Sequence, residues 1–123
     1  MRYLCLVHFA GEALEAIDEA SRPAFDREAL AYDRLLMEQG HFIAAEALQS
    51  PESAVLVRVR NGEVSTTDGP FAEAKEQTGG FILIEARDMA EAVRLAAGIP
   101  LARLGTIEVR PIYIIPGSDA PAS

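Results

Sequence analysis

A short segment concentrates ionisable side chains between two turn-forming boundaries. Asp68-Gly69-Pro70 opens the segment, and Gly79-Gly80 closes it directly before an apolar run. Its ionisable residues are Asp68, Glu73, Lys75 and Glu76. Nearby charges move the pKa of a carboxyl in either direction, so Asp68 is a candidate proton acceptor, and Lys75 and Glu76 are candidate ligand contacts. A plain turn is the alternative, because Asp, Gly and Pro each favour turns for separate backbone reasons.

His8 is a second candidate for proton transfer. It lies near the end of an apolar stretch and shares one side of a strand with Leu4 and Leu6. A histidine there is either packed and hydrogen-bonded, or placed at the mouth of a barrel, where it shuttles protons near neutral pH. Glu46 interrupts the apolar run at 42–48 and is either a solvated edge residue or a buried carboxylate.

The last apolar stretch combines an acid with a base. Glu108 and Arg110 are two residues apart, so both lie on one face of a strand. They form either a surface ion pair or part of a cleft in which the planar guanidinium of Arg110 holds an anion. Tyr32 fits the buried face of a helix, and its hydroxyl is a further candidate for contact with a ligand.

Composition narrows the class of protein. The chain has 123 residues and a formal net charge of −8, which disfavours direct binding to nucleic acid and to anionic membranes. Two His and one Cys lack the spacing of a zinc site, and no nucleotide-binding glycine motif is present, so we predict no metal and no cofactor. A single Cys excludes an internal disulfide, and no apolar run could span a bilayer; both favour a cytoplasmic protein.

Apolar periodicity and turn signals predict the elements that position these residues. We expect strands at 3–9, 42–48, 54–60, 63–67, 80–85 and 106–115, helices at 23–39 and 88–97, and one short helical turn within 13–20. Asn61-Gly62 predicts a hairpin turn, since both central positions of such a turn need positive φ. Asp88 and Glu91 form a capping box, and the buried stripe of its helix is predicted to be Met89, Ala92, Val93 and Ala96.

The order of these elements predicts an α+β fold. Strand, helix, strand, hairpin, strand, helix, strand is a ferredoxin-like split βαβ arrangement with an inserted hairpin. We expect one domain over 1–115 and a disordered, Pro-rich tail over 116–123. Two helices cover only one face of a sheet, yet the runs at 3–7, 81–84 and 112–115 are apolar on both faces. We therefore infer a homodimer that packs sheet on sheet and closes a dimeric α+β barrel.

These motifs resemble the YCII-related family, in its DGPF branch. The segment at 68–73 with Lys75-Glu76 is similar to the branch signature almost letter for letter, with Ala74 in place of its usual Thr. Gly79-Gly80, Gly40 with the run at 46–48, and the run at 108–111 also match. The resemblance covers about residues 2–114 and implies the same ferredoxin-like dimeric barrel.

The resemblance also implies a site. It implies a His–Asp pair in a cleft, and some relatives eliminate chloride from lactones. Asp68 corresponds to the Asp of that pair, whereas the His is expected early on the first helix, where this chain has Ala29. Members of the DGPF branch often occur beside extracytoplasmic-function sigma factors, which implies a regulatory role.

Two functions remain open from the sequence. The first is a cofactor-independent enzyme that abstracts a proton and then eliminates or isomerises, with Asp68 and His8 as catalytic residues. Its anionic substrate would be held by residues drawn from Lys75, Glu76, Arg110, Glu46 and Tyr32. The second is a non-catalytic module that senses a metabolite or contacts a sigma factor, and Ala29 favours this alternative.

Overall fold

The computed structural model describes residues 1–72 and 74–118. Glu73 of the charged segment and 119–123 of the predicted tail lie outside the described residues. The strands are β1 (Arg2–Phe9), β2 (Phe42–Ala47), β3 (Val55–Arg60), β4 (Glu63–Asp68), β5 (Gln77–Glu85) and β6 (Thr106–Pro111). The helices are α1 (Gly11–Glu15), α2 (Arg22–Glu38) and α3 (Met89–Ala96), with the 3₁₀ turns η1 (Pro51–Ser53) and η2 (Pro100–Arg103).

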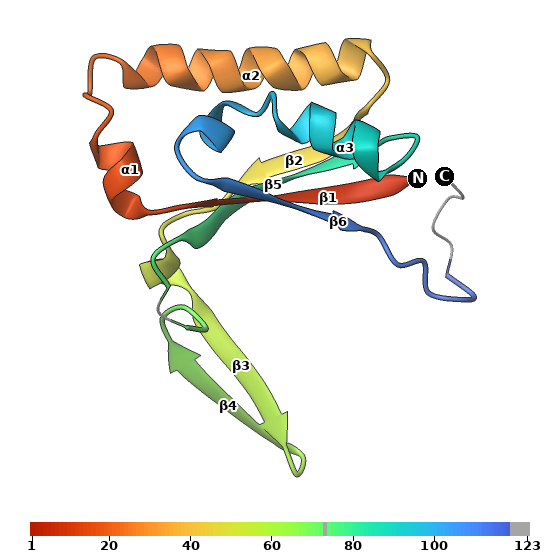
Figure 1. Ribbon diagram of the computed structural model, residues 1–123. Coiled ribbons are helices and arrows are strands. Elements are labelled where there is room, and N and C mark those ends of the chain that lie inside the picture. Colours follow the sequence, from red (N-terminus) through yellow and green to blue (C-terminus); the bar gives the residue numbers. More distant parts are fainter. Residues whose placement is uncertain (73, 119–123) are drawn as a thin grey trace.

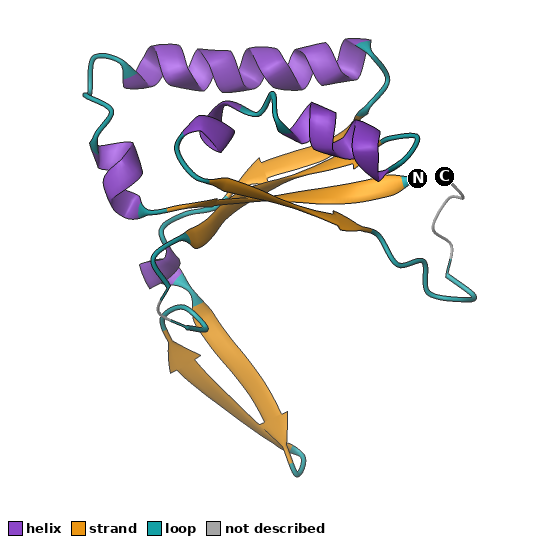
Figure 2. Cartoon of the chain, viewed as in Figure 1, coloured by secondary structure: helices purple, strands orange, loops and turns teal. Residues whose placement is uncertain are grey.

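Four strands form one antiparallel sheet in the order β2-β5-β1-β6. β1 and β2, which α2 connects, are separated by β5, and this order is compatible with the predicted ferredoxin-like fold. Figures 1 and 2 show α2 and α3 on one face of this sheet. The opposite face carries neither α2 nor α3, and we call it the open face.

The core lies between the helices and the inner face of the sheet. Tyr3, Cys5 and Val7 of β1 are buried there, and the residues between them are only partly buried. β5 alternates in the same way, with Ile82 and Ile84 buried. Burial raises the pKa of the Cys5 thiol to about 11, so this thiol stays protonated at neutral pH.

The capping box at the start of α3 is confirmed for Asp88, whereas Glu91 bonds the residue before the N-cap. Asp88 Oδ1 accepts a hydrogen bond from the Glu91 N–H, and Glu91 Oε1 accepts one from the Arg87 N–H, both at 2.9 Å. The first bond satisfies a backbone donor that the first turn of the helix leaves without a partner, and the second ties Glu91 to the residue before the cap. Within the described residues, no helix is both long and apolar enough to cross a membrane.

The predicted buried stripe of α3 was partly wrong. Met89 and Val93 are 39% and 52% exposed, and the buried residues of the helix are Glu91, Ala92, Leu95 and Ala96. A helix of eight residues offers two adjacent apolar stripes, and local periodicity does not choose between them. The next residue that is buried, Ile99, continues the Ala92–Leu95–Ala96 stripe, so contact with the sheet selects that side.

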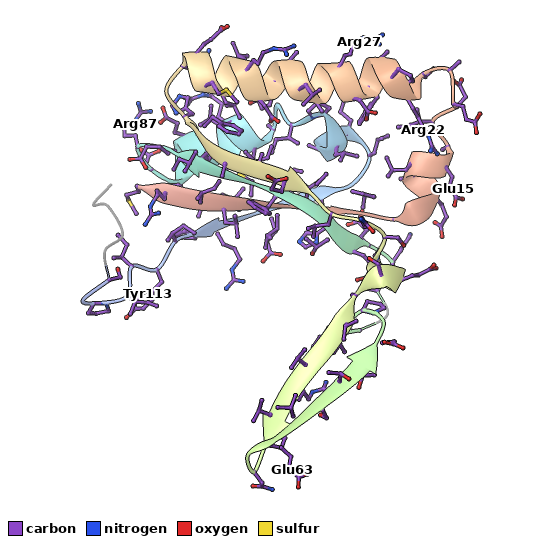
Figure 3. All side chains as sticks on the ribbon, turned by 180° about the vertical axis from the view of Figure 1, so that it is seen from behind. Glu15, Arg22, Arg27, Glu63, Arg87 and Tyr113 are labelled. Carbon is purple, nitrogen blue, oxygen red and sulfur yellow. The ribbon has the colours of Figure 1, made fainter. Side chains whose placement is uncertain are left out.

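β3 and β4 form a separate two-stranded sheet that projects from the open side of the main sheet (Figure 1). Their turn has positive φ at Asn61 and Gly62, 52° and 78°, as the sequence predicted. Figure 3 shows Glu63 at the far end of this hairpin. One hairpin face carries exposed valines, which are Val55, Val57, Val59 and Val64.

β6 is shorter than predicted. It ends at Pro111, which pairs with Tyr3, and not at Ile115. Ile112 still donates its N–H to the Arg2 carbonyl at 3.0 Å, but β1 begins at Arg2 and offers no further partner. Apolar composition does not extend a strand without a neighbour to complete its backbone hydrogen bonds.

Removing the Asp88 side chain tests the cap of α3. Asp88→Ala is expected to lower the free energy of unfolding by about 1 kcal/mol, because the Glu91 N–H loses its acceptor. Asp88→Asn keeps an acceptor oxygen and is the matched control, with little expected change. Urea denaturation followed by circular dichroism measures both variants. Equal losses in the two would show that the cap does not act through this hydrogen bond.

Candidate functional site

On the open face, His8 lies between two polar partners. Its Nε2 is 2.9 Å from Oε1 of Glu108 on β6, and its Nδ1 is 3.0 Å from Oγ1 of Thr78 on β5. β5 and β6 flank β1 on its two sides, so each neighbouring strand supplies one contact. We refer to His8, Thr78 and Glu108 as the His8 array.

Hydrogen-bond chemistry sets the proton positions in the neutral imidazole of His8. An ionised carboxylate only accepts, so Nε2 donates its proton to Glu108. Nδ1 then has a lone pair and accepts from the hydroxyl of Thr78. In the array, the Glu108 carboxylate orients the imidazole through Nε2 and leaves Nδ1 as the basic nitrogen. This arrangement is typical of proton-transfer sites.

A β-bulge shapes the array. Val7 pairs with Gly80 but His8 pairs with Thr78, which leaves Gly79 as an extra residue in β5. Bulges re-aim side chains and are frequent beside active sites. A Cβ at position 79 would overlap the ring of Phe9, so the glycine is needed for this close approach rather than for flexibility.

Two further predicted contacts lie beside the array. Thr106 lies opposite His8 in the pairing of β6 with β1, and its hydroxyl donates a hydrogen bond to Oε1 of Glu76 at 2.8 Å. Arg110 Nε is 3.9 Å from Oε2 of Glu108, and its side chain is largely exposed. The open face thus gathers a base, a cation and two carboxylates. Even so, no group of three or more His, Cys, Asp or Glu residues in the described chain is placed to hold a metal ion.

Asp68 and Lys75 lie apart from the array. Asp68 is the last residue of β4, pairs with Val55 and is exposed; Lys75 is exposed in the following loop. Gly69 has a φ of 99°, which favours a turn at this position, and its N–H donates to the Ala54 carbonyl across the end of the β3–β4 pair. The hydrogen bonds and ion pairs of the described chain connect neither side chain to the His8 array. The catalytic role of Asp68 remains a prediction.

A cavity of about 510 Å³ lies on the other side of the sheet, between α2, η2, β2 and β5. Glu46 borders it from the edge strand β2, but its side chain is exposed, which favours the interpretation as a solvated edge residue. Ala29 lines the cavity from α2. The cavity therefore has a methyl group where the resemblance implies an imidazole.

Tyr32 also lines this cavity, but its hydroxyl is already engaged. It donates to the Leu95 carbonyl at 2.5 Å, and its ring packs against Gly98, where a Cβ would overlap it. Burial raises the pKa of Tyr32, and the nearby Cys5 adds to the shift. Tyr32 therefore ties α2 to the end of α3, and its role as a ligand contact remains a prediction.

Asp33 is a cavity residue that we did not single out from the sequence. Its carboxyl is half-buried beside the cavity, and burial raises its pKa. Asp26, Ala29 and Asp33 follow one another at spacings of three and four residues, so all lie on one helix face. That spacing was the signal from which the sequence could have indicated Asp33 as a site residue, but a mixed apolar and acidic face is also typical of an exposed helix.

Asp33→Asn tests the burial of this carboxyl. The folded pKa lies above the ordinary 3.8, so the wild-type protein loses stability as pH rises from below 3.8 through the folded pKa. Above that window the variant is expected to be more stable than the wild type, by less than about 1 kcal/mol because solvent screens the exposed part of the carboxyl. Below the window the two should be equal.

Urea unfolding at several pH values measures this difference. Asp26→Asn changes an exposed carboxyl on the same helix face and is the matched control, with no pH-dependent difference expected. A stabilisation of Asp33→Asn that persists unchanged at low pH would contradict the burial argument.

Comparison with known proteins places this architecture in a family. A family model described as the YCII-related domain matches residues 1–115, a range that includes both the His8 array and the cavity. An uncharacterized protein of Rhizobium meliloti (strain 1021) is 34% identical over 98 residues, which cover 78% of this chain and 79% of that protein. The chain therefore belongs to the YCII-related family.

Proposed function

We propose that this protein, a DGPF-branch member in the cytoplasm, is a homodimer that binds a small anionic molecule and transfers its protons without a cofactor. The observation that carries the proposal is the hydrogen-bonded His8, held by Thr78 at one ring nitrogen and by Glu108 at the other. A base with a fixed orientation and a carboxylate behind it is suited to take a proton and to stabilise the resulting imidazolium.

The proposed step starts when the hydroxyl of Thr78 rotates from Nδ1 toward the ligand. A C–H bond beside a ligand carbonyl then breaks, its proton goes to His8 Nδ1, and its electron pair forms an enolate. Glu108 stabilises the imidazolium at Nε2, and the guanidinium of Arg110 pairs with the charge of the anion. Return of the proton at another carbon completes an isomerisation, and departure of a leaving group completes an elimination.

The exposed apolar surface of the open side supports the homodimer. Leu4 and Leu6 of β1 face this side, opposite Leu83 and Phe81 of β5 and on the same sheet face as the His8 array. The hairpin projects on this side and exposes four valines by 56–68%. A second copy would cover both surfaces and exclude water from His8. In this arrangement Asp68 and Lys75 would reach the cleft from the hairpin side of the other copy.

Deuterium exchange into pyruvate tests the proposed chemistry. Pyruvate is a small carboxylate whose methyl C–H bonds lie beside a carbonyl, so proton abstraction in D₂O removes its methyl ¹H signal. The wild-type protein is expected to accelerate this loss, and His8→Asn should reduce the acceleration by about 10²-fold or more, because general base catalysis is lost. Arg110→Gln should raise the pyruvate concentration at which the exchange rate reaches half of its maximum.

His41→Asn is the matched control for this assay. His41 bonds through Nδ1 to the Glu85 carbonyl, remote from the array, so the exchange rate should be retained. No acceleration by the wild type, or equal rates for wild type and His8→Asn, would contradict proton transfer by His8. Circular dichroism of each variant separates loss of the base from loss of the fold.

Sedimentation equilibrium tests the assembly. At micromolar concentration the wild type is expected to have twice the chain mass, and Leu6→Arg should give single chains, because a charge would be buried in the sheet-on-sheet contact. Val93→Arg places the same charge on α3, where the native side chain is 52% exposed, and should leave the dimer intact. A wild-type protein that sediments as a single chain would exclude this assembly.

Ala29 supports a second function, a non-catalytic sensor. A methyl group in the cavity wall can contact a ligand but cannot take the role of the histidine that the resemblance implies at this position, which supports binding without that base. In this role ligand binding would regulate an extracytoplasmic-function sigma factor, detected as a gel-filtration shift on mixing. Binding in the cavity without any deuterium exchange would favour the sensor over the enzyme.

A further inference from the structure

Small side chains create the cavity beneath α2. Ala29 of α2 and Ala45 and Ala47 of β2 line it and leave space that larger residues would fill, and Gly80 of β5 also lines it. A Cβ on Gly80 would stand 2.8 Å from the backbone oxygen of Glu46, so this position stays small for steric reasons. The resulting 510 Å³ falls within the roughly 300–1,000 Å³ of pockets that hold small molecules.

The polar character of the cavity comes from carboxylates. Asp33 lines it with a half-buried carboxyl, whose pKa is raised by burial. Within residues 1–72 and 74–118, no hydrogen bond or ion pair reaches the carboxyl of Asp33, and no Lys, Arg or His lines the cavity. Asp26 adds a second, exposed carboxyl on the same helix face.

This combination selects one class of ligand. A carboxylate ligand would meet like charge without a compensating cation, which is unfavourable where water is partly excluded. An uncharged ligand would fill the apolar volume but leave the half-buried carboxylate without a partner. An ammonium group on an apolar body satisfies both parts of the site, because it pairs with Asp33 while the body displaces water from the apolar wall.

We propose that the cavity binds a small apolar amine, with its ammonium group paired to Asp33 and its apolar part against Ala29, Ala45 and Gly80. The inference names the ligand class for the sensing function and is independent of His8, which lies on the other side of the sheet. The open face, with Arg110, and the cavity, with Asp33, then have opposite charge preferences.

Three matched probes test the inference on the full chain. They are 4-phenylbutylamine, 4-phenylbutanol and 4-phenylbutyrate, which share one apolar body and differ in the terminal group. The amine is expected to bind at least about tenfold more tightly than the alcohol, and the butyrate more weakly than either. Calorimetry measures the affinities, and ¹⁵N-resolved NMR should show the largest amide shifts at Ala45, Gly80 and Ile82.

Three variants separate recognition of charge from occupation of the cavity. Asp33→Asn should reduce the affinity for the amine to that for the alcohol. Asp26→Asn should retain most of the preference for the amine over the alcohol. Ala29→Leu should weaken all three probes, because its side chain occupies the cavity.

Three results would overturn the inference: no binding of the amine, an amine no tighter than the alcohol, or a preference that Asp33→Asn leaves unchanged. Alcohol or butyrate binding at least as tight as that of the amine, with shifts at Gly80, would refute only the amine class and leave a sensing cavity in place. If none of the probes binds, the amine class is refuted, and deuterium exchange still reports on His8 separately.

Discussion

Side-chain alternation along β1 is the constraint on which the rest of the structure depends. β1 lies between β5 and β6, so each of its residues is committed either to the helices or to the open face. Tyr3, Cys5 and Val7 anchor the core, which forces Leu4, Leu6 and His8 to the opposite side. A register shift of one residue would bury the imidazole under the helices and expose the core. The position of the candidate base is therefore a consequence of core packing.

Close backbone approaches hold that base in place. Phe9 lies over Gly79, and the His8 carbonyl lies against Gly105, where a Cβ would overlap it. The bulge at Gly79 brings Thr78 opposite His8, so the hydroxyl and the imidazole meet across neighbouring strands. Larger side chains at either glycine would move β5 or β6 away from β1. The hydrogen bonds of the His8 array thus depend on residues that carry no chemistry of their own.

The sheet separates two environments of opposite character. Its open face has an imidazole and a guanidinium beside Glu108, and the hairpin projects away from the sheet on the same side (Figure 1). Its helix side has an apolar cavity bordered by Asp33 and Asp26. Because a four-stranded sheet with its packed side chains lies between them, ligands on the two sides would not compete directly. A binding event on one side could reach the other through β1 and β5, which contribute to both.

Local signals in the sequence determined the elements, the Asn61-Gly62 turn, the α3 cap and the side of β1 that carries His8, because each depends on neighbours within a few residues. The end of β6 and the buried stripe of α3 were decided by tertiary partners that local periodicity does not contain. The sequence placed Glu108 beside Arg110 on one strand, but His8 and Glu76 were separate candidates. Only the folded sheet brought His8 to Thr78 and Glu108, which lie 70 and 100 positions away, and Glu76 to Thr106. Asp33 likewise acquired its environment from packing between α2 and the sheet. Side-chain type and strand side are properties of short segments, whereas convergence depends on which distant segments pack together.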